Sequence, residues 1–339
     1  DEKVVRAVPS IGYVHRGLEK LVEKRDFKQF IYVAERVCGI CSFGHGWGYA
    51  KAVEGLMEID VPRRASYLRT IWHELSRLHS HLLWLGLGAD ALGFESLFMH
   101  CWRLRETILD IFEETTGGRV IFSVCEVGGV RRDLTDAMKK DIEEKLTGLT
   151  KEIEEMASVF LYDDTIQTRL EGVGILSMND AMDLGCVGPM ARASGVPNDY
   201  RMADDDGAYR DLGFHPVLEQ TGDCLARAKV RIRELYQSID IILGALENLP
   251  EGAIASPVRG VPPKGEFFTR VEQLPSPHPD ELQYRGPRQN AARLRPRRCA
   301  EYHPDHRPLH QLLRKIGRVQ GSRFRVQGCG GTVGESVLP

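Results

Sequence analysis

The segment from residue 16 to residue 45 decides how the rest of this sequence is interpreted. It reads RGLE at residues 16–19, then ERVCGIC at residues 35–41 after a gap of fifteen residues, and then His45. The CxxC spacing puts Cys38 and Cys41 on one turn with both thiols pointing the same way. Thiolates are soft ligands that suit zinc, copper, nickel or iron–sulfur chemistry. The segment therefore contains a candidate metal site, and Glu19 and His45 are candidates for a proton carrier and for a group that orients a thiolate. Glu19 alone is also compatible with a solvated helix residue.

A CxxC pair alone leaves three other interpretations open, namely half of a zinc site, a thioredoxin-type redox pair, or two buried thiols. The complete string is more specific. RGxE, the fifteen-residue gap, ERxCGxC and the final His resemble the first metal-binding signature of the nickel–iron hydrogenase large subunit, and every fixed position is present. The nearest branch is that of the energy-converting, membrane-associated hydrogenases, whose large subunit is also related to the quinone-site subunit of respiratory complex I.

Composition is that of a globular chain. The 339 residues are 42% hydrophobic and 27% charged, enough for one large or two ordinary domains. No apolar run reaches the roughly eighteen residues that a membrane span needs, and no signal peptide is visible. The eight cysteines are mostly far apart, which favours a reducing cytoplasm over a disulfide framework. Four of them are predicted to be buried structural thiols: Cys101, Cys125, Cys186 and Cys224.

Hydrophobic periodicity predicts a mainly α (α+β) chain with a few short strands. This agrees with the fold that the resemblance implies, a long helical bundle with small peripheral β elements. Helices are expected at residues 15–23, 42–57, from Pro62 to the glycines at 86, 88 and 93, 95–115, 134–161 and 222–249. Residues 119–133 are expected to form a strand or loop with a glycine turn. The helix at 134–161 carries a heptad stripe of apolar residues: Ile142, Leu146, Leu149, Ile153, Met156 and Phe160. His73, His79 and His81 are interpreted as packed or surface histidines rather than ligands, because they lack zinc-helix spacing.

Two domains are predicted, a hydrogenase large-subunit-like domain at 1–273 and an atypical Arg/Pro-rich segment at 274–339. The first residue is Asp1, which indicates a processed chain or a fragment, and the resemblance implies a missing N-terminal strand region. Residues 285–339 contain twelve Lys and Arg against three Asp and Glu, a net charge of +9, so the remainder of this −3 chain carries −12. The abrupt change is interpreted as a frameshift, a sequencing error, an alternative end or a disordered segment rather than a nucleic-acid site.

The resemblance also stops at about Leu274. The family needs a second pair of thiolates from a motif DPCxxC near the C-terminus, and this sequence lacks that motif. Cys299 and Cys329 are the remaining thiols in this segment, and they are thirty residues apart. The sequence as written supplies half of the expected coordination sphere.

The resemblance implies a catalytic role for Glu19, Cys38 and Cys41, with Cys38 a terminal nickel ligand and Cys41 a bridge between nickel and iron. His45 and Arg36 would surround the ligands. The cofactor would be a nickel–iron centre with carbon monoxide and cyanide on iron. An iron–sulfur cluster would lie on a partner, not on this chain.

The expected activity is reversible reduction of protons to dihydrogen, coupled to ion pumping. The expected partners are a small subunit with a 4Fe–4S cluster, ferredoxin-like subunits and integral membrane subunits, without nucleic acid. The chain would lie peripherally on the cytoplasmic side of the membrane.

Two other functions remain open from the sequence. One is a metal-free, complex I-like subunit that passes electrons to quinone or another acceptor, which the missing second cysteine pair favours. The other is a scaffold subunit whose basic tail binds lipid or nucleic acid, in which case binding would be salt-sensitive. The intact first motif argues against both.

Overall fold

The computed structural model describes residues 17–203 and 207–271. The predicted segment 274–339, with Cys299 and Cys329, lies outside the described residues. The described part of the chain is mainly helical with one small sheet, as predicted from the sequence. Its α-helices are α1 (Leu18–Val22), α2 (Phe27–Glu35), α3 (Ser42–Met57), α4 (Arg63–Ala91), α5 (Glu95–Thr116), α6 (Asp136–Tyr162), α7 (Asp164–Leu170), α8 (Met178–Asp183), α9 (Pro189–Ala193) and α10 (Cys224–Glu247), and a 3₁₀ turn η1 covers Tyr200–Met202.

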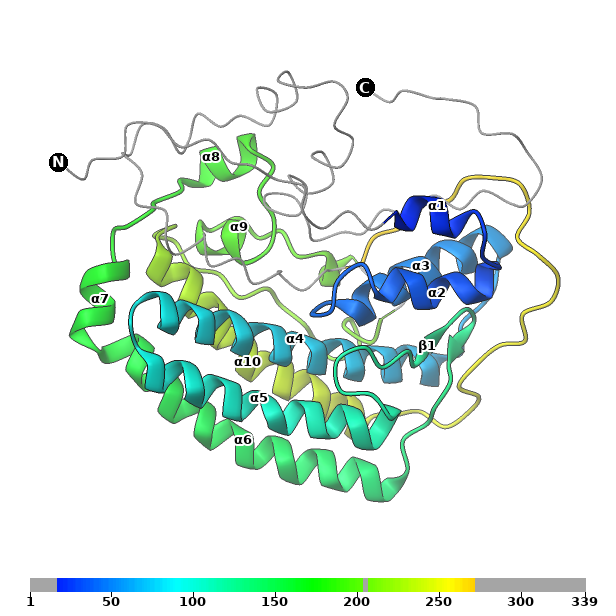
Figure 1. Ribbon diagram of the computed structural model, residues 1–339, viewed down its shortest axis with the longest axis horizontal. Coiled ribbons are helices and arrows are strands. Elements are labelled where there is room, and N and C mark those ends of the chain that lie inside the picture. Colours follow the sequence, from blue (N-terminus) through cyan, green and yellow to red (C-terminus); the bar gives the residue numbers. More distant parts are fainter. Residues whose placement is uncertain (1–16, 204–206, 272–339) are drawn as a thin grey trace.

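Four long helices, α4, α5, α6 and α10, form the bundle that dominates Figure 1. Helix α4 lies between α5 and α10 and packs extensively against both. All six residues of the predicted heptad stripe on α6 are buried. Burying a side chain of this size contributes roughly 1.5–3 kcal/mol relative to leaving it in water. The apolar stripe therefore fixes which face of α6 meets the bundle.

Helix α4 continues through two of the glycines that were predicted to end it. Gly86 and Gly88 lie inside the helix, which ends at Ala91. A Cβ on Gly86 would lie 3.2 Å from Cβ of Cys101, so the missing side chain allows α5 to approach closely. Three short helices, α7, α8 and α9, also lie between α6 and α10, where the sequence analysis predicted no helix. Cys186 is half-buried rather than buried, whereas the other three predicted structural thiols are buried.

A short hairpin connects the bundle to the segment around residue 255. Strands β1 (Cys125–Glu126) and β2 (Gly129–Val130) pair antiparallel, with Gly128 in a left-handed turn at φ 92°. The amide of Val130 donates to the carbonyl of Ile254 at 2.9 Å. This sheet confirms the strand and glycine turn expected at residues 119–133.

A buried ion pair holds this hairpin on α3 and α4. Arg69 Nη2 donates to Glu54 Oε1 at 2.6 Å and to the carbonyl of Glu126 at 2.8 Å. The amide of Gly128 donates to the same carboxylate at 2.7 Å. Charge-assisted bonds of this kind are the strong ones in proteins, and here they connect three elements.

Glu74 of α4 is the acceptor at the centre of a second buried charge network. Its carboxylate accepts hydrogen bonds from Ser238 at 2.7 Å, Tyr209 at 2.8 Å and Arg77 at 3.0 Å. Arg201 Nη1 lies 3.4 Å away. Burial raises the pKa of Glu74, but Arg77 and Arg201 outweigh it and hold this pKa well below its ordinary value.

The network continues from η1 to α9 and α10. Arg201 contacts both carboxylate oxygens of Asp199, at 3.0 and 2.7 Å. Arg192 of α9 connects Asp199, at 3.0 Å, to Glu234 of α10, at 2.7 Å. The other oxygen of Glu234 lies 2.6 Å from His81 Nε2, and burial lowers the pKa of His81 to about 4. These contacts fasten the irregular segment around residue 200 to the bundle.

Candidate metal centre

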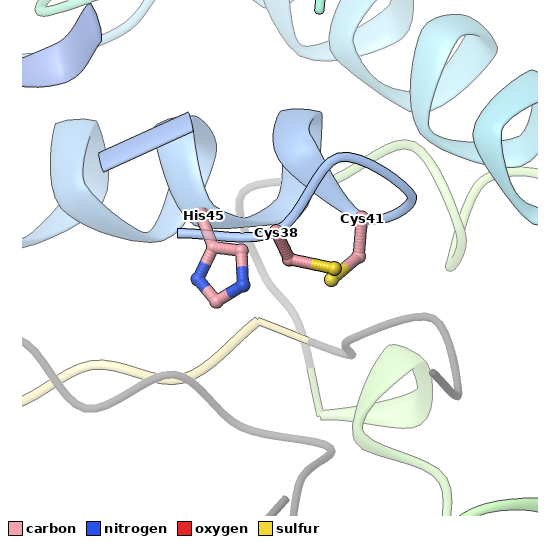
Figure 2. Close-up of side chains that lie close together, drawn as sticks. All are labelled: Cys38, Cys41 and His45. Carbon is pink, nitrogen blue, oxygen red and sulfur yellow. The ribbon is translucent and has the colours of Figure 1, made fainter. Parts of the chain in front are cut away.

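The two motif cysteines lie in the connection between α2 and α3. Cys38 lies in the turn after α2, and Cys41 is the residue that precedes α3. His45 is on the first turns of α3. One ligand atom from each of these three residues lies within 4.8 Å of the others, and Figure 2 shows the two sulfurs turned toward each other beside the imidazole. Cys41 and His45 are buried and Cys38 is half-buried.

The surroundings of Cys38 favour the thiolate. A hydrogen bond from the Cys41 thiol has the largest effect, and together with His45 it outweighs burial and lowers the pKa of Cys38 to about 3. A thiolate is the form of cysteine that binds metals. The cluster therefore offers a soft metal ion one thiolate, an imidazole and a second thiol that would lose its proton on binding.

The turn that holds the cysteines is fastened on two sides. Ser42 Oγ donates to the carbonyl of Val120 at 3.0 Å, in the connection that follows α5. Ser76 of α4 donates to the carbonyl of Ile40 at 3.4 Å. Farther along α3, Trp47 packs edge-on against the ring of His73 of α4, with the two ring centroids 5.2 Å apart. The two hydrogen bonds join the cysteine turn to α4 and to the connection after α5.

The structure brings together Cys38, Cys41 and His45 but not all the predicted residues. Glu19 lies in α1, and its side chain is outside what the structure describes. Arg36 is the residue that follows α2; its Nη1 donates to the carbonyl of Tyr32 at 2.8 Å, and 49% of its side chain is exposed. The roles of these five residues stay predictions. Among the described residues this cluster is the one group of His, Cys, Asp and Glu with metal-ligand geometry.

Sequence reasoning missed Glu35, the acidic residue at the start of the cysteine motif. Its side chain is 1% exposed, and the hydroxyl of Ser123 donates to Oε2. Burial raises the pKa of Glu35 to about 7. The sequence signal was its position beside the motif, three residues before Cys38, but nothing in the sequence shows that it is buried.

A cavity of about 760 Å³ lies farther along α3. Lys51, Arg63, Phe268 and Arg270 are among its lining residues, and none of the three cluster residues is. The candidate centre is therefore separate from this cavity. No helix in the ranges that the structure describes is long and apolar enough to cross a bilayer.

Comparisons with known proteins agree with this fold and motif. Residues 91–282 match the family described as the 49 Kd subunit of respiratory-chain NADH dehydrogenase, and residues 16–86 match the family described as nickel-dependent hydrogenase. The two matches meet near the end of α4. The cysteine motif and most of α4 thus match one family, and α5, α6 and α10 match the other.

Curated relatives come from both groups. The membrane-bound hydrogenase subunit alpha of Pyrococcus furiosus is 39% identical over 260 residues, which cover 75% of this chain and 61% of that protein. One of the subunits of the F(420)H(2) dehydrogenase of Methanosarcina mazei is 40% identical, over 80% of this chain and 75% of that protein. The NADH-quinone oxidoreductase subunit 4 of Thermus thermophilus is also 40% identical, over 80% of this chain and 67% of that protein. This chain thus spans less than two thirds of the Pyrococcus protein.

These matches confirm the family expected from the motif, and they establish an oxidoreductase lineage whose members include subunits of a membrane-bound hydrogenase and of an NADH-quinone oxidoreductase. The chain belongs to the family of the NADH dehydrogenase 49 Kd subunit, which is related to the large subunits of nickel-dependent hydrogenases.

Proposed function

We propose that this chain is the large, catalytic subunit of a nickel–iron hydrogenase in an energy-converting complex at a membrane. The observation that supports the proposal is the cluster of Cys38, Cys41 and His45, with their ligand atoms within 4.8 Å of one another. A metal-free electron-transfer subunit has no need for two converging thiols, one of which is held as a thiolate.

The residues present fit half of a four-thiolate centre. Cys38 and Cys41 would hold it on this side. None of the other four described cysteines, Cys101, Cys125, Cys186 and Cys224, lies in the cluster of Cys38, Cys41 and His45. The second pair of thiolates would therefore come from outside the described residues.

A nickel–iron centre bound here supplies the heterolytic cleavage of dihydrogen and its reverse, 2H⁺ + 2e⁻ to H₂. The protein residues then handle the protons. The sulfur of a cysteine ligand accepts a proton, Glu19 takes it from the sulfur, and His45 orients a thiolate by a hydrogen bond. Electrons pass to a partner subunit that carries an iron–sulfur cluster, because the described residues hold no cluster-binding cysteine set.

The partners we propose are that small subunit, ferredoxin-like subunits and integral membrane subunits, with the chain on the cytoplasmic side. The name of the Pyrococcus relative, which belongs to a membrane-bound hydrogenase, supports the membrane association.

The alternative is a metal-free subunit like those of the NADH-quinone oxidoreductases. The observation that favours it is that the described residues supply a single cysteine pair. Nickel and iron analysis of the complex, purified without oxygen, distinguishes the two functions. About one nickel per chain together with dihydrogen production from a reduced dye supports the hydrogenase. A folded complex without nickel and without dihydrogen production supports the metal-free subunit.

A further inference from the structure

Arg105 of α5 is a buried cation whose described contacts are all to neutral side chains. The residue is 7% exposed. Its Nη2 donates to Nε2 of His79 on α4, and its guanidinium carbon lies 4.5 Å from the centroid of the Trp102 ring. Its Nε is buried and has no acceptor among the residues that the structure describes. Arginine is almost never buried without a charged partner, so this side chain needs an explanation.

His79 does not supply the missing negative charge. Its Nε2 accepts the hydrogen bond from Arg105, so its ring proton lies on Nδ1. Burial, together with the charge of Arg105, lowers the pKa of His79 to about 3, and the imidazole is therefore neutral. Nδ1 of His79 and Nε1 of Trp102 are also buried donors without an acceptor in the described part of the chain. The surroundings of Arg105 thus offer N–H donors and no carboxylate.

The acidic residue next to Arg105 in sequence is already paired elsewhere. Burial lowers the pKa of Arg105, and the charge of Glu106 opposes this effect without reversing it. Glu106 Oε2 lies 2.5 Å from Nη2 of Arg119, whose Nη1 lies 2.7 Å from both Asp110 and Glu113. The acids on this side of α5 therefore surround Arg119 and leave Arg105 without a direct ion pair.

Other arginines of the bundle show what Arg105 lacks. Arg103, two residues away on α5, is 67% exposed and lies 3.1 Å from Glu152 of α6. Arg69, which is as deeply buried as Arg105, lies 2.6 Å from Glu54. A buried charge is costly unless an opposite charge is close, because the protein interior solvates it poorly. We therefore expect the carboxylate for Arg105 to come from outside the described residues.

The surface next to Arg105 has the composition of an interface core. Trp102 is half-buried and packs edge-on against Phe98, with the ring centroids 5.5 Å apart. Met99 lies three residues before Trp102, on the same side of the helix, and is 60% exposed. Tryptophan, methionine and arginine are enriched in interfaces between proteins, and buried tryptophan and arginine often dominate their binding energy.

We propose that Trp102 and Arg105 anchor an interface with a partner subunit, which presents a carboxylate to Arg105 and an apolar side chain to Trp102. Charge complementarity selects this occupant, because a guanidinium matches a carboxylate in both charge and hydrogen-bond geometry. Nε of Arg105 is the donor left for this carboxylate, since Nη2 is bound to His79. The inference requires a complex of several subunits but no metal, so it is independent of the proposed hydrogenase activity.

Carbodiimide cross-linking of the complex, purified with its native partners, tests this contact. Arg105→Lys keeps the positive charge and supplies an amine, which a carbodiimide joins to a carboxylate in contact with it. Mass spectrometry of the peptides then identifies both residues. Arg103→Lys is the matched control, because Glu152 lies beside that position. We expect the peptide with position 105 to be linked to an Asp or Glu of another subunit, and the peptide with position 103 to Glu152.

Dissociation of the complex on dilution, followed by mass photometry, measures the size of the effect. Arg105→Gln should raise the dissociation constant of this chain from the complex about 30-fold or more, because it leaves the partner carboxylate unpaired. Trp102→Ala should raise it about tenfold or more. Arg103→Gln should change it less than about threefold, because its ion pair is exposed and lies within this chain.

The isolated full chain separates an interface role from a structural one. Arg105→Gln should keep the helical circular dichroism and should unfold at the same urea concentration as the wild type, or at a higher one. The physical reason is that the charge it removes has no carboxylate partner in the described part of the chain. A residue that stabilises the fold would instead shift the unfolding midpoint to a lower urea concentration.

Three results would each overturn the inference. The first is a peptide with position 105 that is linked only within this chain, or to no acid, while the Arg103→Lys control forms its link. The second is an unchanged dissociation constant in Arg105→Gln, and the third is a lower urea midpoint of that variant. Stabilisation of the isolated wild-type chain by inorganic phosphate, lost in Arg105→Gln, would assign Arg105 to a free anion and also overturn it. None of these measurements depends on nickel, so failure of the hydrogenase function would be seen separately.

Discussion

Neutralising Glu74 is expected to destabilise the fold strongly without affecting the metal residues. The Glu74 carboxylate is fully buried, and the side chains of Arg77 and Arg201 beside it are 0% and 1% exposed. Glu74→Gln leaves both guanidinium groups without this negative partner. Breaking a buried ion pair by removing one partner costs about 3–5 kcal/mol. Because total stability is typically about 5–15 kcal/mol, this one substitution should remove a large part of it.

The pH dependence gives the same prediction a second readout. The pKa of Glu74 is held below its ordinary value in the folded chain. The contribution of the Glu74 carboxylate to the free energy of unfolding is therefore fully present above its pKa in the unfolded chain, about 4.3. This contribution is lost as the pH falls through the lower pKa of the folded chain. The difference in unfolding free energy between wild type and Glu74→Gln should be constant near neutral pH. It should shrink once the pH falls below about 4.

Urea unfolding followed by circular dichroism measures both effects. The matched control is Glu152→Gln on α6, where the partner Arg103 lies 3.1 Å away but the two side chains are 46% and 67% exposed. An exposed pair of this kind contributes about 0–1 kcal/mol. Equal losses in the two variants, or a Glu74→Gln loss below about 1 kcal/mol, would contradict the reasoning from burial.

Three further predictions concern the metal site and the backbone. Cys38→Ser and Cys41→Ser should each lose nickel, because a serine hydroxyl is a poor ligand for a soft metal, and their helical circular dichroism should be unchanged. The control Cys186→Ser, which lies outside the cluster, should keep its nickel. Gly129→Ala should destabilise the fold by more than about 1 kcal/mol in urea unfolding, because its Cβ would overlap the backbone of the segment around residue 255. Gly148→Ala, in α6 with nothing within 4 Å of the added Cβ, should instead stabilise it by roughly 0.5–1 kcal/mol, and a destabilisation there would contradict the helix-propensity argument.

The long helices could be predicted because the periodic spacing of their apolar residues is visible within a short stretch of sequence. The apolar stripe of α6 repeats every three or four residues, and each member is buried. The end of α4 was predicted too early because Gly86 is a packing glycine rather than a stop signal. The short helices α7 and α8 were missed because one or two turns carry too little periodicity, although Asp163 and Ser177 cap them with side-chain oxygens.

The candidate centre was partly predictable for the same reason. Cys38, Cys41 and His45 are neighbours in sequence, so their spacing alone brings them together. The hydrogen bond from Ser123 to Glu35 joins residues 88 positions apart, and a sequence reveals no such pairing. Glu74 meets Arg201 across 127 positions. Acidic residues on a predicted helix are ordinarily assigned to its solvated face, so the buried charges stay hidden until distant partners are known.

Nickel content and fold stability should therefore respond to different residues. The ligand cluster occupies the turn before α3 and its first turns. Farther along the same helix, Glu54 joins the hairpin through Arg69, and the Glu74 network lies within the bundle. Substituting a cluster cysteine removes a ligand and breaks neither ion network, whereas Glu74→Gln weakens the bundle and leaves every ligand in place. If Cys38→Ser unfolded the chain as much as Glu74→Gln, the cysteine pair would be a structural element. The metal-free function would then explain this part of the sequence better than the hydrogenase does.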